Sequence, residues 1–165
     1  MTDIWPPEKR SQVMARIRGS NTRPELLMRA AFHRAGIRYR SQQRIGGCRV
    51  DFVLPDLRIA LLVHGCFWHG CPRHCVRPSA NASFWTDKLK KNRMRDASQA
   101  RKIRGAGWRL VVIWEHSLAS PLHADREAKR LRRSATNSIN RRQRKRAMAR
   151  AAASLKQGLT ESTTI

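Results

Sequence analysis

Twelve consecutive residues near the middle of the chain carry most of its potential chemistry. The segment HGCFWHGCPRHC, residues 64–75, holds three His and three Cys, and between them the adjacent aromatics Phe67 and Trp68. Cys and His are the usual ligands of structural zinc, and His is also a common proton carrier near neutral pH. The segment therefore predicts a loop that combines a metal site with a reactive or binding surface.

The cysteines and histidines of this loop suit a structural zinc site. Such sites take four ligands, often closely spaced in one loop with another ligand from elsewhere. Three loop ligands, together with His116 after the last predicted strand, would fasten the loop to a sheet. The alternative is that the cysteines are small buried apolar groups, as we expect for the isolated Cys48. The candidate loop ligands are Cys66, Cys71, His74 and Cys75.

A second group of residues fits phosphodiester hydrolysis. Asp51 lies in an apolar strand, where an ionised carboxylate is costly unless a cation or donor meets it. The next strand ends at His64, so the two side chains can converge, with His69 just beyond. A carboxylate that holds Mg²⁺ and a neutral imidazole are what this reaction requires. Glu25 could add a second carboxylate, and it also suits the acidic position of a helix capping box.

Phe67 and Trp68 have two interpretations. Large aromatic side chains usually fold into a core. Beside a basic surface they could instead insert between base pairs, as apolar wedges do in proteins that distort DNA. Met14, on a basic N-terminal segment, could act as a wedge from the other side.

The charge of the chain points to a polyanion. Thirty-five Lys and Arg against eleven Asp and Glu give a net charge of +24. The longest apolar run, RIALLVHGCFW, is too short to span a bilayer and contains His and Gly, so no membrane association is expected. The N-terminus has no signal-peptide pattern, which predicts a cytoplasmic, nucleoid-associated protein with reduced cysteines.

The order of elements predicts one α/β domain between two basic segments. Thr22, Pro24, Glu25 and Gly36 mark the start and end of an amphipathic helix. Three strands follow, the last two forming a hairpin around the two-residue turn Pro55-Asp56. A long basic helix, residues 83–107, and a buried strand, residues 108–114, complete the order α-βββ-α-β.

Two basic segments flank this predicted domain. The expected organisation is a basic DNA-binding arm over residues 1–20, a catalytic domain over residues 21–124 and a basic tail over residues 125–165. The arm contains a short basic helix that ends at Gly19. The tail has twelve Lys and Arg against three acids, so it is expected to be helical or disordered.

Four sequence blocks together resemble one known family. They are RSQVMARIRGSNTRPELLMRAAFHRAGIRYR, VDFVLPDLRIALLVHGCFWHGCPRHC, FWTDKLKKNRMRD and GWRLVVIWEHSL, and they are similar to the very short patch repair (Vsr) DNA mismatch endonucleases. The resemblance implies a restriction-endonuclease-like fold. It also implies nicking of double-stranded DNA 5′ of the T in a T:G mismatch, which arises when 5-methylcytosine deaminates. The expected partners are mismatched duplex DNA and mismatch-repair proteins, with the enzyme a monomer.

The resemblance also implies roles for individual residues. Asp51 and the backbone carbonyl of Val63 would bind Mg²⁺, and His64, His69 and Glu25 would complete the active site. The wedge residues would be Met14, Phe67 and Trp68. The zinc ligands would be Cys66, Cys71, His74 and His116, with Cys75 as the alternative to His74.

Two other classes of protein remain compatible with these residues. One is a zinc-stabilised DNA-binding module without catalysis, which would leave Asp51 and His64 without a role. The other is a restriction-type nuclease with a different target, which would cut a duplex that contains no mismatch.

Overall fold

The computed structural model describes residues 19–76, 78–79, 81–134, 136 and 148. Met14, nearly all of the expected basic arm and most of the expected tail therefore lie outside the described residues. The chain divides into two units, residues 1–129 and residues 130–165. The fold below is that of the first unit; in the second, residues 130–134 are helical.

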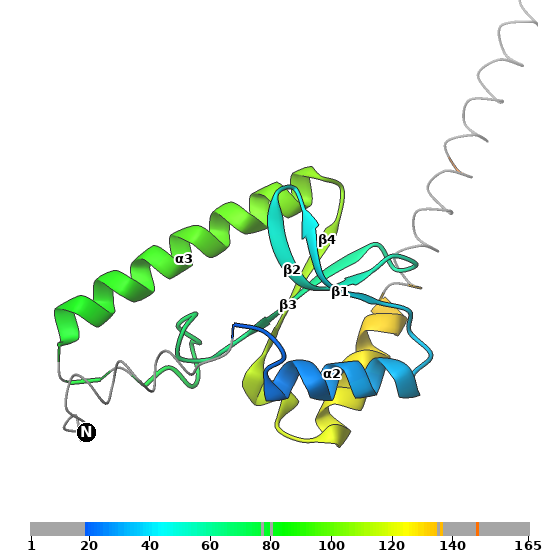
Figure 1. Ribbon diagram of the computed structural model, residues 1–165, viewed down its shortest axis with the longest axis horizontal. Coiled ribbons are helices and arrows are strands. Elements are labelled where there is room, and N and C mark those ends of the chain that lie inside the picture. Colours follow the sequence, from blue (N-terminus) through cyan, green and yellow to red (C-terminus); the bar gives the residue numbers. More distant parts are fainter. Residues whose placement is uncertain (1–18, 77, 80, 135, 137–147, 149–165) are drawn as a thin grey trace, which may run out of the picture. The chain divides into compact units, whose positions relative to one another are not determined.

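The elements of the first unit follow the predicted order. A helix, three strands, a long helix and a fourth strand succeed one another, and a short 3-10 helix and the helical residues 121–129 come after them (Figure 1). The elements are α2 (Arg23–Arg34), β1 (Arg40–Ile45), β2 (Cys48–Leu54), β3 (Ile59–His64), α3 (Ala82–Gly105), β4 (Arg109–Trp114) and η1 (Glu115–Leu118).

Helix α2 begins where the capping signals predict. Thr22 is the N-cap and Pro24 lies in the first turn. The Glu25 carboxylate accepts hydrogen bonds from the Asn21 backbone N–H at 3.0 Å and from the Thr22 hydroxyl at 2.9 Å. The Thr22 hydroxyl thus donates to Glu25 and leaves the helix N–H groups uncapped, and Glu25 accepts from the N–H of Asn21 rather than that of the N-cap, so neither bond of a capping box forms. The bonds from Asn21 and Thr22 nevertheless fix the position of Glu25.

The four strands form one mixed sheet in the order β1-β2-β3-β4. β1 pairs with β2 and β2 with β3 in antiparallel fashion, whereas β3 and β4 are parallel. The hairpin between β2 and β3 is confirmed, but its turn runs over four residues from Pro55 to Arg58, which has a φ of 53°. The expectation of a buried fourth strand is wrong for most of β4, which is half-buried because it lies at a sheet edge.

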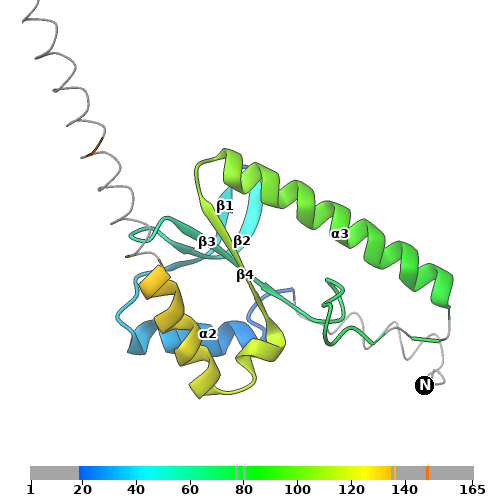
Figure 2. The same ribbon diagram turned by 180° about the vertical axis from the view of Figure 1, so that it is seen from behind.

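Helices α2 and α3 cover opposite faces of this sheet (Figures 1 and 2). Phe52 packs edge-on against Phe32 of α2, with ring centroids 5.5 Å apart. The next residue, Val53, points the other way and joins a core cluster with Ile103 of α3. Cys48 is half-buried beside that cluster, so its predicted core position holds only in part. The cluster comprises Ile45, Val50, Val53, Ala60, Leu62 and Ile103.

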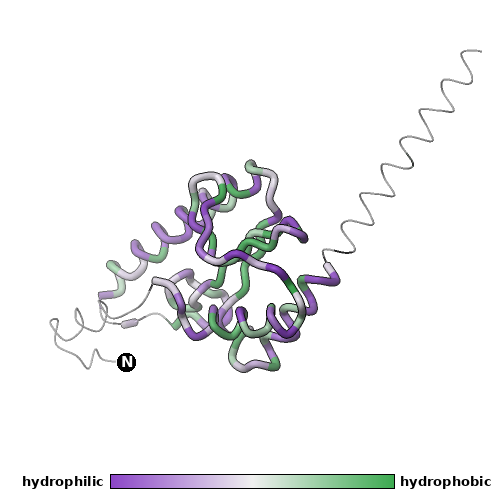
Figure 3. The backbone as a smooth tube through the Cα atoms, turned by 45° about the vertical axis from the view of Figure 1, so that its right-hand side comes forward, coloured by the Kyte–Doolittle hydropathy of each residue, from purple (hydrophilic) through white to green (hydrophobic). Residues whose placement is uncertain are grey.

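Helix α3 is the most basic element of this unit. Its 24 residues hold eight Lys and Arg against two Asp, and most of its length is hydrophilic while the central strands are apolar (Figure 3). None of the helices within the described residues has the length and hydrophobicity needed to cross a membrane. α3 therefore presents a cationic surface beside the sheet.

Candidate active site and metal centre

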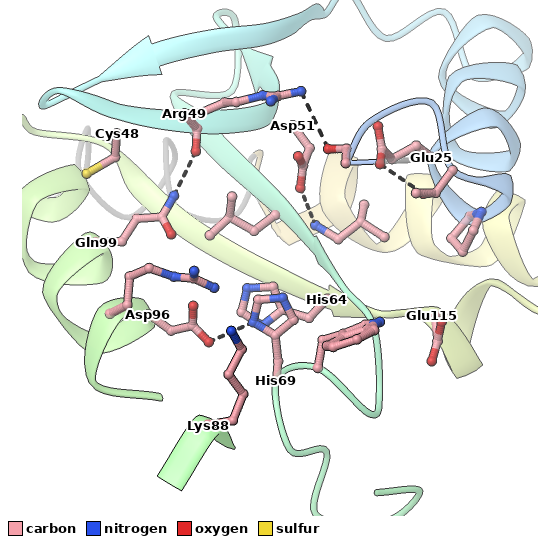
Figure 4. A pocket seen from close by; sticks show the side chains of 18 of the residues that line it. Glu25, Cys48, Arg49, Asp51, His64, His69, Lys88, Asp96, Gln99 and Glu115 are labelled. Carbon is pink, nitrogen blue, oxygen red and sulfur yellow. Dashed lines mark hydrogen bonds and ion pairs between the residues drawn. The ribbon is translucent and has the colours of Figure 1, made fainter. Parts of the chain in front are cut away.

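An open pocket of about 1360 Å³ collects the predicted catalytic residues. It is bordered by the start of α2, by β2 and the end of β3, by the loop after β3 and by α3 (Figure 4). Its lining includes the acids Glu25, Asp51, Asp96 and Glu115 and the cations Arg49, Lys88, Arg95 and Lys102. Carboxylates can hold a metal ion, and cations in the same pocket can hold an anionic substrate.

Asp51 projects from β2 toward the end of β3. Its Oδ2 accepts a hydrogen bond from the Val63 backbone N–H at 2.8 Å. Burial raises the pKa of Asp51 above its usual value; the Val63 hydrogen bond opposes this, and the nearby charge of Glu25 adds to it. A half-buried carboxylate whose ionised form is disfavoured in this way gains from a bound cation. Asp51 and the Val63 peptide thus fit the hard-cation site that the sequence predicts, because both offer oxygen atoms.

Glu25 is buried, with 4% of its surface exposed. Besides the bonds from Asn21 and Thr22, its Oε2 accepts one from Nε2 of Gln42 in β1 at 3.2 Å. The helix start and the sheet therefore both hold this carboxylate. Glu25 thus accepts bonds from the two residues that precede α2 and also lines the pocket beside Asp51.

His64 and His69 form a stacked pair of imidazoles. Their ring centroids are 3.8 Å apart with an interplanar angle of 13°. Nδ1 of His69 also lies 2.7 Å from Oδ2 of Asp96 in α3. Such a carboxylate fixes the orientation and tautomer of an imidazole and leaves Nε2 available for proton transfer. Sequence reasoning missed Asp96; the signal was an isolated acid in the basic segment RMRD.

Two further residues of α3 hold the backbone on either side of His69. Asn92 Nδ2 donates to the Trp68 carbonyl at 2.8 Å, and an Arg93 guanidinium nitrogen donates to the Gly70 carbonyl at 3.1 Å. Gly70 has a φ of +63°, and a Cβ at this position would lie 2.7 Å from Arg93. The positive φ therefore favours glycine at this position, next to Arg93 of α3.

The predicted wedge residues of the loop belong to an aromatic cluster. Trp85 of α3 lies 5.0 Å from Phe67 and 6.3 Å from Trp68, measured between ring centroids. Phe67 and Trp68 are half-buried, whereas the adjoining Phe84 is 59% exposed. Trp68, Phe84 and Trp85 all line the pocket. The two aromatics of the loop thus lie neither in the core nor free in solvent.

The four predicted zinc ligands come together, three from this loop and His116 from η1. Ligand atoms of Cys66, Cys71, His74 and His116 all lie within 4.8 Å of one another. The Cys66 sulfur is 3.1 Å from Nδ1 of His116, and the Cys71 sulfur is 3.9 Å from Nδ1 of His74. Cys75 lies outside this group, and its sulfur contacts the Phe67 carbonyl at 3.8 Å. The geometry favours His74 over Cys75 as a metal ligand.

The donor set of this cluster fits a zinc ion. Two sulfurs and two imidazole nitrogens from two separate segments match a closed tetrahedral site. Burial raises the pKa of the Cys66 thiol to about 11. Burial also acts to raise the pKa of Cys71, but hydrogen bonds involving Arg73 and His74 lower it to about 7. A dication would offset the cost of ionising two adjacent buried thiols.

The titration of His64 predicts a pH-dependent stability. Burial and the neighbouring His69 lower its pKa to about 4 from an ordinary 6.5. Between these values the unfolded chain binds more protons, so the free energy of unfolding should decrease as pH falls from about 6.5 to about 4. Thermal denaturation at pH 7 and pH 5 should show a larger loss of Tm in the wild type than in His64→Gln. The exposed His33, replaced by Gln, is the control; an equal loss in all three proteins would contradict the assignment.

The pocket combines a carboxylate, two imidazoles and several cations beside a strongly basic helix. These are the groups that a nuclease requires. The family model described as DNA mismatch endonuclease Vsr matches residues 2–77. A relative from Escherichia coli, "DNA mismatch endonuclease Vsr", is 31% identical to this chain over 121 residues, which cover 72% of this chain and 76% of the relative. The chain belongs to the Vsr family of DNA endonucleases, as its four sequence blocks predict.

Other relatives carry a different name. The "Type II nicking enzyme V.XorIIP" of Xanthomonas oryzae is 37% identical over 123 residues, covering 72% of this chain and 88% of the relative. The "Type II nicking enzyme V.NaeI" of Lentzea aerocolonigenes is 39% identical over 112 residues, covering 65% and 68%. These names describe those proteins as cutting one strand.

Proposed function

We propose that this protein is a Mg²⁺-dependent endonuclease that nicks double-stranded DNA on the 5′ side of the T in a T:G mismatch. Such a mismatch arises when 5-methylcytosine deaminates, and the nick would initiate very short patch repair. The observation that carries the proposal is the meeting of Asp51, the His64–His69 pair and the aromatic cluster in one pocket. Membership of the Vsr family supports it.

The residues of the pocket have separable roles in this proposal. Asp51 and the Val63 carbonyl would hold Mg²⁺, whose chemistry is to polarise the phosphate and activate water. His69, oriented by Asp96, transfers a proton at Nε2, and the His64 ring stacks against it. The order α-βββ-α-β and the mixed sheet agree with a restriction-endonuclease-like core.

DNA binding in this proposal depends on phosphates. Arg49, Lys88, Arg95 and Lys102 line the pocket, and the chain carries a net charge of +24. Cations that neutralise phosphates release counterions, so affinity should fall steeply with salt. Zinc held by Cys66, Cys71, His74 and His116 would fix the loop that carries His69 and Trp68.

The decisive experiment is strand nicking of an end-labelled duplex with one T:G mismatch, in Mg²⁺ or in EDTA. A Mg²⁺-dependent nick 5′ of the mismatched T, absent from the matched C:G duplex, is the expected result. Cutting of both duplexes would favour the second candidate, a nicking enzyme for matched DNA, which the names of two relatives suggest. Binding without cutting would favour a non-catalytic DNA-binding module.

Replacing Trp68 with Ala should lower the preference for T:G more than it lowers binding to matched duplex. The substitution removes the aromatic wedge from the pocket and leaves the phosphate contacts, and stacking of a base on an aromatic ring contributes roughly 1–3 kcal/mol. Affinities for the two duplexes, measured by fluorescence anisotropy, test this. The control is Trp108→Ala, because Trp108 lies under Arg58 at 4.9 Å and does not line the pocket. Equal losses on both duplexes would mean that Trp68 only packs.

A further inference from the structure

Gln42 occupies an unusual backbone position opposite Asp51. In the β1–β2 ladder, Ser41 pairs with Phe52 and Gln43 with Val50, so Gln42 and Asp51 face each other between these two pairs. The φ of Gln42 is +54°, in the left-handed region. A residue with a Cβ rarely adopts this conformation within a strand, and it persists only where the surroundings enforce it. Such positions concentrate at functional sites.

The side chain of Gln42 bridges two charged groups of the pocket. Its Nε2 donates to Oε2 of Glu25 at 3.2 Å, and its Oε1 accepts a hydrogen bond from Nε of Arg49. A carboxamide can do both because one end is a donor and the other an acceptor. A carboxylate would repel Glu25, and an ammonium would repel Arg49. The residue type thus matches this bridge between an acid and a base.

The two groups that Gln42 holds are charged groups of the pocket that contains Asp51. Glu25, Arg49 and Asp51 line the same pocket, and Arg49 lies two residues from Asp51 on β2. The other bonds to Glu25, from Asn21 and Thr22, are local to the start of α2. The bond from Gln42 comes from a different element and ties the start of α2 to the sheet at the level of Asp51.

We propose that Gln42 is a positioning residue for strand cleavage, which holds the Glu25 carboxylate and the Arg49 guanidinium at fixed places beside Asp51. The proposal rests on the proposed cleavage at Asp51. Gln42 acts through its two partners and does not touch the DNA. Its loss should therefore lower the rate of cleavage far more than it lowers duplex affinity.

Two substitutions separate the side chain from the backbone. Gln42→Gly removes the carboxamide and accepts the positive φ without strain. Gln42→Glu keeps the size and the contact with Arg49 but places a second carboxylate against Glu25. The matched control is Gln43→Gly, because Gln43 is the next residue of the same strand and its side chain bonds to the Ser41 carbonyl.

Single-turnover nicking and duplex affinity are then measured for each protein. Both Gln42 variants should cut on the order of 10²-fold more slowly, the loss expected for a small misplacement of reacting groups, with a dissociation constant within about twofold of wild type. Gln43→Gly should cut at the wild-type rate. In a Glu25→Gln background, adding Gln42→Gly should slow cleavage little further, because both substitutions weaken the same hydrogen bond between Gln42 and residue 25.

Each outcome decides the proposal. The proposal is overturned by any of three results. These are a wild-type cleavage rate in Gln42→Gly, the same decrease in rate in Gln42→Gly and Gln43→Gly, and effects of Gln42→Gly and Glu25→Gln on the rate that are fully additive. A wild-type protein that cuts no duplex would instead overturn the proposed function. The positioning role is then judged by the NMR resonance of the Val63 amide, which donates to Asp51. The chemical shift of this amide should change in Gln42→Gly and remain at its wild-type value in Gln43→Gly. An unchanged chemical shift in Gln42→Gly contradicts the proposal.

Discussion

Asp51→Asn should reduce nicking by about 10³-fold or more while duplex binding stays near the wild-type level. A metal ion held at the reacting phosphate contributes several kcal/mol to transition-state stabilisation, and each 1.4 kcal/mol corresponds to about tenfold in rate. Asparagine keeps the shape and can still accept the bond from the Val63 N–H, but it loses the charge. Single-turnover nicking and anisotropy titration measure the two quantities on one protein.

The same substitution should not destabilise the protein. Burial and Glu25 both disfavour the ionised form of Asp51, so a neutral amide removes an unfavourable charge from metal-free protein. The matched control is Asp56→Asn, because Asp56 is an exposed acid of the β2–β3 turn that pairs with Arg38 at 2.9 Å. Retained nicking in Asp51→Asn would remove this residue from the mechanism. Parallel losses of Tm and activity would assign it a structural role.

Replacing a predicted zinc ligand should abolish zinc binding and markedly lower the free energy of unfolding. Cys71→Ser should bind no stoichiometric zinc and should lose at least about 3 kcal/mol of stability, which is roughly 6–12 °C of Tm for a chain of this size. Nicking should fall with it, because the loop between Cys66 and Cys71 carries Trp68 and His69. Zinc content by mass spectrometry of the native protein and Tm by calorimetry provide the measurements.

Two matched controls make this result specific. Cys75→Ser changes a cysteine of the same loop whose sulfur contacts a carbonyl, and Cys48→Ser changes one at the margin of the core. Both should retain zinc and activity. Zinc loss in Cys75→Ser with retention in His74→Ala would reverse the assignment of the fourth ligand. Retention of zinc by Cys71→Ser would exclude this cluster as the site.

Local signals in the sequence predicted much of the fold. The N-cap Thr22 and the acid three residues later marked the start of α2, and an apolar run on each side of Pro55 marked the β2–β3 hairpin. The sequence also predicted that cysteines and histidines of the loop of residues 64–75 come together, because His and Cys at this density are typical of metal sites, and Cys66, Cys71 and His74 do lie in one cluster with His116. These signals depend on residues that are close together in the sequence, so they can be recognised without the tertiary structure.

Contacts between distant segments depended on the tertiary structure. Asp96 of α3 reaches His69 across 27 residues, and Gln42 meets Glu25 of α2 across 17. Each pairing needs a particular angle and register of α2 or α3 against the sheet, which packing on both faces sets and no short motif encodes. By itself the sequence determined which side chains could act, the order of the elements and the cationic character of the chain. Only the packed fold decided that His74, and not Cys75, lies in the Cys/His cluster, and that Gln42 bonds to Glu25 opposite Asp51 in the sheet.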